Sequence, residues 1–146
     1  MQWAPISYWR FSGYADFFRF PWIKYVRDAP SSGQEDMIQA DFNGIKNTTI
    51  STRYRFRQRE KNITEEHEVW IKPVDQHRIR LQITHKSSDA TTLRTTIEGN
   101  IYDDNTSSPG HGWVISENAG WKNPNLPVQI DAYAAYFHTT DYNSRI

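Results

Sequence analysis

Residues 48–60 read TTISTRYRFRQRE, and this stretch decides the fold class. Tyr54 and Phe56 alternate with arginines on either side, and the same order runs back through Ile50 and Thr52. Successive side chains of a β-strand point to opposite faces, so this order with period two predicts a strand with one apolar face and one charged face.

The same alternation recurs along the chain without comparable helical spacing. It predicts seven strands, at residues 8–20, 35–43, 48–60, 77–86, 91–102, 112–122 and 127–138. Short connections near residues 43–44, 87–90 and 123–126 alternate with long ones at 21–34, 61–76 and 103–111. This order is typical of an antiparallel up-and-down meander with tight turns at one end and long loops at the other. Residues 142–146 resemble the start of an eighth strand, so the expected fold is all-β, with about seven to eight strands.

Length and composition narrow the class of protein. The chain has 146 residues, which fits a single domain over residues 1–146. Its 17 basic residues balance its 17 acidic ones, so it lacks the charge excess of a dedicated polyanion binder. It contains no cysteine, which excludes disulfides and thiolate chemistry. Aromatic residues nevertheless make up 14% of the chain, which is high for a chain with so many charged residues.

The polar face carries charges of both signs, as expected for the ion-paired, hydrated lumen of an outer-membrane barrel. A tilted strand of roughly 9 to 11 residues spans a bilayer, and the expected strands are about this long. We therefore favour a partial transmembrane-type β-barrel. The charged side chains expected in its lumen are Arg53, Arg55, Arg57, Arg59, Arg78, Arg80, Arg94, Asp16, Asp41, Glu98 and Asp131.

Large aromatic residues lie near the ends of the expected strands. In outer-membrane barrels such rings form girdles at the two membrane interfaces. The residues expected in these girdles are Trp9, Phe17, Trp22, Trp113, Trp121 and Tyr136.

The alternative is a soluble lipocalin-like barrel that binds a small apolar ligand. In such a barrel the apolar face points inward and the charged face meets solvent. The interior would then contain Phe11, Phe42, Phe56, Leu81 and Ile130.

Five segments also resemble a group of outer-membrane β-barrel proteins of Bacteroidota, the helix-hairpin-helix-containing group. The segments are residues 14–22 with 28–34, 54–61, 111–113, 129–138 and 141–146. The resemblance implies that this chain corresponds to the C-terminal barrel region of a longer protein, with the remainder of the barrel missing from the chain. The helix-hairpin-helix module has no counterpart here, so no nucleic-acid role is carried over.

The arginines at positions 53 to 59 have two interpretations. They could line a path that favours small anionic solutes, or they could pair with acidic side chains on neighbouring strands and fix the register. We favour the structural interpretation because acidic residues are available on the same face. Nucleic-acid binding is not expected, because alternating arginines and aromatic rings point to opposite faces.

No motif indicates catalysis or a bound group. A Gly-x-Ser-x-Gly elbow is missing, and the acidic clusters at residues 65–68 and 103–105 lack the spacing of a metal site. We expect a non-enzymatic protein without cofactor or metal, located in the bacterial outer membrane, with lipid and small anionic solutes as its partners. Its role would be that of a pore, a transporter or a structural barrel.

Overall fold

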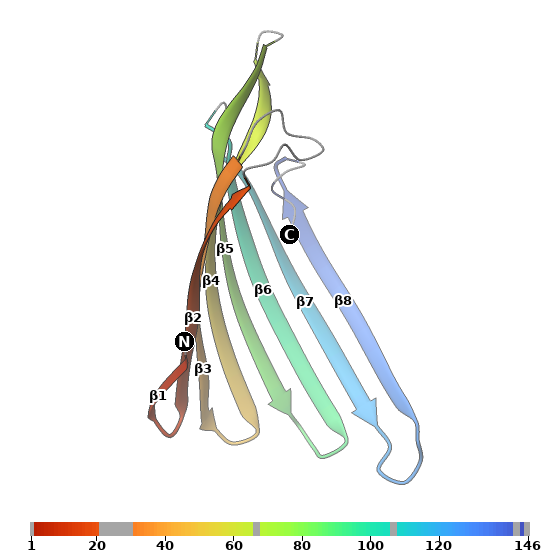
Figure 1. Ribbon diagram of the computed structural model, residues 1–146. Coiled ribbons are helices and arrows are strands. Elements are labelled where there is room, and N and C mark those ends of the chain that lie inside the picture. The colour runs from red at the N-terminus through yellow and green to blue at the C-terminus, as the bar shows by residue number, and fades with distance from the viewer. Residues whose placement is uncertain (1, 21–30, 66–67, 106–107, 142–143, 145–146) are drawn as a thin grey trace.

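The computed structural model describes residues 2–20, 31–65, 68–105, 108–141 and 144 (Figure 1). Eight strands follow one another in a single antiparallel sheet, each hydrogen-bonded to the next in sequence. They are β1 (Gln2–Ile6), β2 (Trp9–Phe20), β3 (Ser31–Ile45), β4 (Thr48–Glu65), β5 (Glu68–Lys86), β6 (Thr91–Asp103), β7 (Gly110–Lys122) and β8 (Gln129–Thr139). The expected all-β up-and-down meander is confirmed. The seven predicted strands correspond to β2–β8, and β1 is too short to show a clear alternation.

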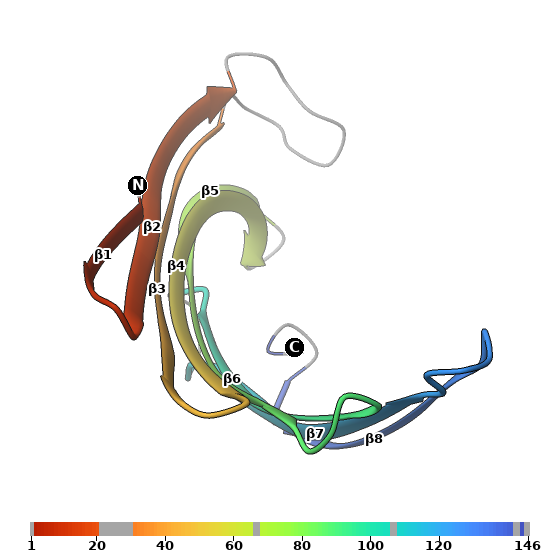
Figure 2. The same ribbon diagram turned by 90° about the horizontal axis from the view of Figure 1, so that it is seen from below.

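The sheet is strongly curved but open. Figure 2 shows it bent like a hook, with β1 and β2 at one end and β7 and β8 at the other. In the part of the chain that the structure describes, β1 and β8 each pair with a single neighbour, so the sheet does not close into a barrel. Residues 142, 143, 145 and 146, where the further strand was expected to start, lie outside the described residues.

The prediction of a long loop at residues 61–76 is wrong. These residues extend β4 and β5 into a hairpin, whose pairs run from Lys61 opposite Lys72 to Glu65 opposite Glu68. Figure 1 shows this hairpin rising beyond the other strands. A hairpin that projects from a sheet has no buried side to impose alternation on its sequence, so period-two analysis does not detect it.

The turn expected at Asn43 and Gly44 lies three residues further along the chain. Lys46 and Asn47 form the connection between β3 and β4, and Asn47 has a φ of 57°. Asparagine tolerates this left-handed conformation better than most residues. Asn43 and Gly44 instead form an irregularity in the β3–β4 register, between Phe42 and Ile45.

Burial differs between the two faces of the curved sheet. Val74, Tyr102 and four polar residues of the strands are buried, and the register places all six on the concave face; Ser144, beyond β8, is buried too. The polar four are Glu35, Asp41, Glu98 and Asn100. No helix in the described residues is long and apolar enough to cross a membrane.

Candidate functional site: the concave polar face

The charged residues selected from the sequence share one face of the sheet. Residues directly opposite each other in an antiparallel pair point to the same side. Across β3 to β6, for example, Gln39 is opposite Arg53, Arg53 is opposite Arg80, and Arg80 is opposite Glu98. The other selected residues follow the same alternation along their strands. The residues placed on this face are Asp16, Asp41, Arg53, Arg55, Arg57, Arg59, Arg78, Arg80, Arg94, Glu98 and Asp131.

Asp41 is the centre of one polar cluster on this face, at the end near the β3–β4 turn. Its carboxylate accepts hydrogen bonds from Arg10 Nη2 at 3.1 Å, Ser51 Oγ at 2.7 Å and Gln39 Nε2 at 2.8 Å. These donors come from β2, β4 and β3 itself, so the buried carboxylate links three adjacent strands. Charge-assisted bonds of this kind are stronger than neutral ones and help to fix the register.

Glu35 is the centre of a second cluster, which the sequence analysis missed. Its carboxylate accepts a hydrogen bond from Tyr14 Oη at 2.5 Å and one from Arg57 Nε at 2.6 Å. Arg55 Nε lies 3.3 Å from Oε1, the oxygen that accepts the bond from Tyr14. Glu35 has the same parity as Gln39 and Asp41, and this signal could have placed it on the charged face.

Glu98 is the centre of the third cluster, on β6. Its Oε2 accepts a hydrogen bond from Arg80 Nε at 2.5 Å, and its Oε1 lies 3.5 Å from Arg78 Nε. Beside it, the buried Asn100 accepts a hydrogen bond from Gln76 Nε2 at 3.0 Å. Arginines thus pair with carboxylates across neighbouring strands, but with other partners than expected. Arg55 and Arg57 pair with Glu35, whereas Asp41 pairs with Arg10, and Glu98 with Arg78 and Arg80.

Other predicted partners do not meet. Arg53 Nε donates to the neutral Gln39 Oε1 at 2.8 Å, and the guanidinium of Arg59 lies over the ring of Phe18. Asp131 accepts a bond from Gln129 Nε2 at 2.8 Å. Among the described residues, neither Asp16 nor Asp131 forms an ion pair with an arginine. The register places Asp16 opposite Glu35 and Asp131 opposite Gly120, so neither has an arginine directly opposite it.

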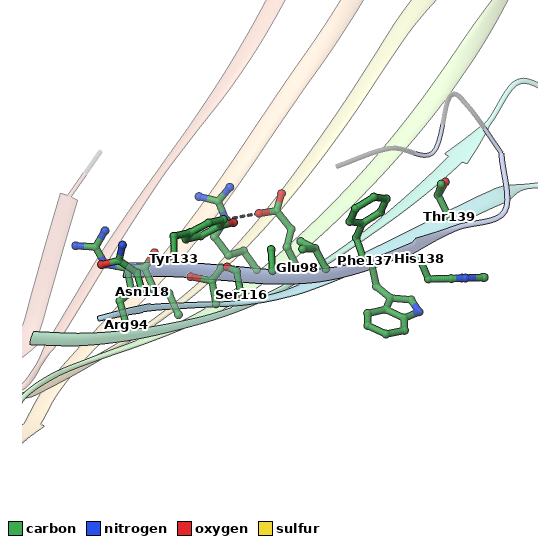
Figure 3. A pocket seen from close by; sticks show the side chains of 14 residues that line it. Arg94, Glu98, Ser116, Asn118, Tyr133, Phe137, His138 and Thr139 are labelled. Atoms are coloured by element: carbon green, nitrogen blue, oxygen red, sulfur yellow. Dashed lines mark hydrogen bonds and ion pairs between the residues drawn. The ribbon is translucent and has the colours of Figure 1, made fainter. Parts of the chain in front are cut away.

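A wide hollow lies on the concave face over β6, β7 and β8. Its volume is about 800 Å³, and its walls combine charged and aromatic side chains. Figure 3 shows the rings of Tyr133 and Phe137 on one side of β8 and His138 on the other. Tyr133 is in line with Asn118 and Arg94, and Phe137 is in line with Val114 and Glu98. Tyr133 and Phe137 are both largely exposed, because β8 is the edge of the sheet.

The convex face carries the aromatic residues expected in the girdles. Trp9, near the β1–β2 turn, packs on Phe42 with ring centroids 4.8 Å apart. At the other end, Trp113 packs on Tyr136 at 5.5 Å. The register places Phe17 and Trp121 on the same face. Trp22 lies outside the described residues.

Charged side chains also lie among the apolar residues of this convex face, Asp36 on β3, opposite Ala15 and Phe56, and Glu117 on β7. Glu117 is halfway between Trp113 and Trp121 on β7, where its Oε2 accepts a hydrogen bond from Thr95 Oγ1 at 2.6 Å. The hydroxyl offsets part of the cost of placing a carboxylate among apolar side chains.

The residues expected inside a soluble barrel lie on the convex face too. On this face Phe42 is opposite Ile50, Phe56 is opposite His77 and Leu81 is opposite Ile97. Phe11 and Ile130 point to the same side of the sheet. The concave face, on the inside of the bend, therefore carries other residues than the alternative expects.

Metal-binding groups do not gather on either face within the described residues. No three histidine, aspartate or glutamate side chains there are close enough to share a metal ion. Part of the acidic segment at residues 65–68 lies outside the described residues. The concave face thus offers arginine donors and carboxylate acceptors, a combination suited to binding and to fixing strand register.

Comparison with known proteins gives no relative: no family model, curated protein or solved structure matches this chain.

Proposed function

We propose that this chain is a segment of an integral outer-membrane β-barrel, with lipid on its convex face and an aqueous lumen on its concave face. One observation carries the proposal, the inverted burial of apolar and charged residues. Phe17, Ile38 and Ile79 are 73%, 64% and 57% exposed, whereas Asp41 and Glu98 are 3% exposed. Water disfavours such an arrangement, and a surrounding bilayer favours it.

The spacing of the aromatic clusters supports the same proposal. Trp113 and Trp121 are eight residues apart on β7. At about 3.4 Å per residue they are separated by roughly 27 Å along the strand, or about 21 Å along the axis of a barrel with a 40° tilt. The apolar band of an outer-membrane barrel is about 25 Å tall. The two clusters thus have the separation of two interfacial girdles.

The proposal also accounts for the asymmetry of the sheet. Tight connections at residues 7–8, 46–47 and 87–90 share one end, and the extended β4–β5 hairpin rises from the other (Figure 1). Short periplasmic turns and longer extracellular segments are typical of outer-membrane barrels. The hairpin would then project outside the cell and the tight turns would face the periplasm.

Further strands must complete the barrel under this proposal. In lipid, an open edge leaves backbone groups unsatisfied at a cost of several kcal/mol each. β1 and β8 are such edges among the described residues. The resemblance to the Bacteroidota barrel group belongs to the same proposal, with the remaining strands supplied by the rest of a longer protein. The role is that of a pore, a transporter or a structural barrel, without catalysis.

Vesicle flotation tests the membrane assignment. Expressed within the complete barrel and reconstituted into phospholipid vesicles, the segment is expected to float with them and to resist extraction by alkaline carbonate. Two neighbouring residues of β7 supply matched variants: Ile115 is on the convex face and Ser116 on the concave face. Ile115→Lys should reduce insertion because a charge would meet lipid, and Ser116→Lys should not. Recovery of the unaltered chain as a soluble monomer without detergent would contradict the proposal.

A further inference from the structure

Four arginines form a square on the concave face. Ion pairing alone does not explain this arrangement. Arg53 on β4 is directly opposite Arg80 on β5, and Arg55 is directly opposite Arg78. The two pairs are adjacent on the same face, and we call these four residues the four-arginine square. Like charges directly opposite each other destabilise a sheet. A chain that keeps two such pairs side by side needs negative charge nearby.

The protein supplies only part of that charge. Glu98 contacts Arg78 and Arg80 from β6, and Glu35 contacts Arg55 from β3. Glu35 is shared with Arg57, which lies outside the square. Four guanidinium groups thus face two carboxylates, one of them shared, and the square keeps an excess of positive charge.

The geometry leaves donors available inside the square. Arg53 and Arg80 bond to protein acceptors through Nε, and Arg55 and Arg78 approach theirs through the same atom. Within the described residues, the terminal Nη nitrogens of the four make no hydrogen bond. Together with Glu98, the four side chains line a small hollow. Planar guanidinium groups bind phosphate-type oxyanions through pairs of parallel hydrogen bonds.

We propose that the four-arginine square binds a phosphate-type oxyanion from the solution on the concave side of the sheet. The inference rests on the proposed function to the extent that an aqueous lumen gives the anion access to the square. The ligand would bridge the two strands and offset the repulsion between the opposed arginines. Its source is either free inorganic phosphate or the phosphate group of a small ester, and both present the same chemistry to the arginines.

Thermal unfolding of the full chain in neutral detergent micelles tests this. Inorganic phosphate should raise the unfolding temperature, because a ligand that binds only the folded state stabilises it. Glycerol phosphate, tested in parallel, distinguishes an ester from the free ion. Sodium chloride at equal ionic strength should give a much smaller effect. An equal effect of chloride would overturn the proposal, since it would reflect screening alone.

Arg53 is the most informative residue to change, because its protein partner is the neutral Gln39. Arg53→Gln should lower phosphate affinity at least tenfold, measured by calorimetry, and leave the phosphate-free protein as stable as the original or more stable. Arg53→Lys keeps the charge without the planar fork and should bind several-fold more weakly. Arg94→Gln is the matched control, because it removes the same charge from the same face outside the square. Its phosphate affinity should change less than twofold.

Two further outcomes separate the site from the membrane assignment. If Arg53→Gln loses stability equally with and without phosphate, the arginines are structural and the oxyanion site is refuted. Phosphate binding by a chain that does not float with vesicles would leave the site intact and refute the barrel. Flotation of a chain on which phosphate has no effect would refute the oxyanion site and leave the barrel proposal intact.

Discussion

At the scale of single residues, Gly112 allows Ser144 to pack closely against the sheet. Its position opposite Thr139 faces the concave side, where a Cβ would meet the carbonyl oxygen of Ser144. Ser144 is fully buried, and its hydroxyl bonds to Thr139 Oγ1 at 2.8 Å and donates to the carbonyl oxygen of Asp141 at 2.9 Å. The role of Gly112 is therefore to make room for this close approach.

Gly112→Ala should therefore release this contact. The added methyl group collides with backbone, which cannot rotate away as a side chain can, so we expect a loss of about 1–3 kcal/mol in unfolding free energy. Hydrogen–deuterium exchange over residues 139–141 should accelerate at least tenfold. Gly99→Ala provides the control, because a Cβ there meets only Ile79 Cγ2 at an ordinary 3.6 Å. Equal protection of residues 139–141 in the two variants would contradict this explanation.

At the scale of elements, β6 shows how one strand serves two environments. Its concave residues include the buried Glu98 and Asn100, and its convex residues include Leu93, Ile97 and Ile101. The three apolar residues are similarly exposed, at 38%, 45% and 49%. They differ in their position along the strand, since Ile97 is central and the other two lie toward the ends.

Arginine substitutions at these three positions of β6 separate the effect of depth in the bilayer from the effect of exposure. In a bilayer the cost of a lipid-facing arginine depends on depth, about 2–4 kcal/mol at the midplane and about 0–1 kcal/mol near the interface. Ile97→Arg should thus cost more unfolding free energy than Leu93→Arg or Ile101→Arg, measured by urea titration in vesicles. On a sheet surrounded by water the three variants would be alike, and that result would contradict the assignment of lipid to the convex face.

Alternation in the sequence predicted strands β2–β8. It also predicted which charged residues share one face of the sheet. It could not predict the β4–β5 extension, because Lys61 to Glu65 pair with β5 through the backbone without a repeating apolar face. It also could not predict the four-arginine square. The opposition of Arg53 to Arg80 depends on the register of β4 against β5, which runs from Thr48 opposite His85 to Glu65 opposite Glu68. Because a loop was expected at residues 61–76, alternation could not specify that register.

At the scale of the whole molecule, curvature converts a two-faced sheet into an inside and an outside. Bending brings the concave side chains together, so Glu35, Asp41 and Glu98 are buried although they are charged. The same bending spreads the convex side chains apart and exposes the apolar ones. The high aromatic content of a chain rich in charged residues follows from this division, since each face concentrates one class of side chain.

The depth of individual tryptophans tests this arrangement across the whole sheet. Variants with a single tryptophan at position 113 or 121, the other tryptophans replaced by phenylalanine, should be quenched most by lipids brominated near the headgroup, because both residues lie at the ends of the apolar band. The control adds Ile97→Trp to a chain without the natural tryptophans. Its fluorescence should be quenched most by lipids brominated near the end of the acyl chain. If all three report the same depth, the convex face does not cross the bilayer from one girdle to the other.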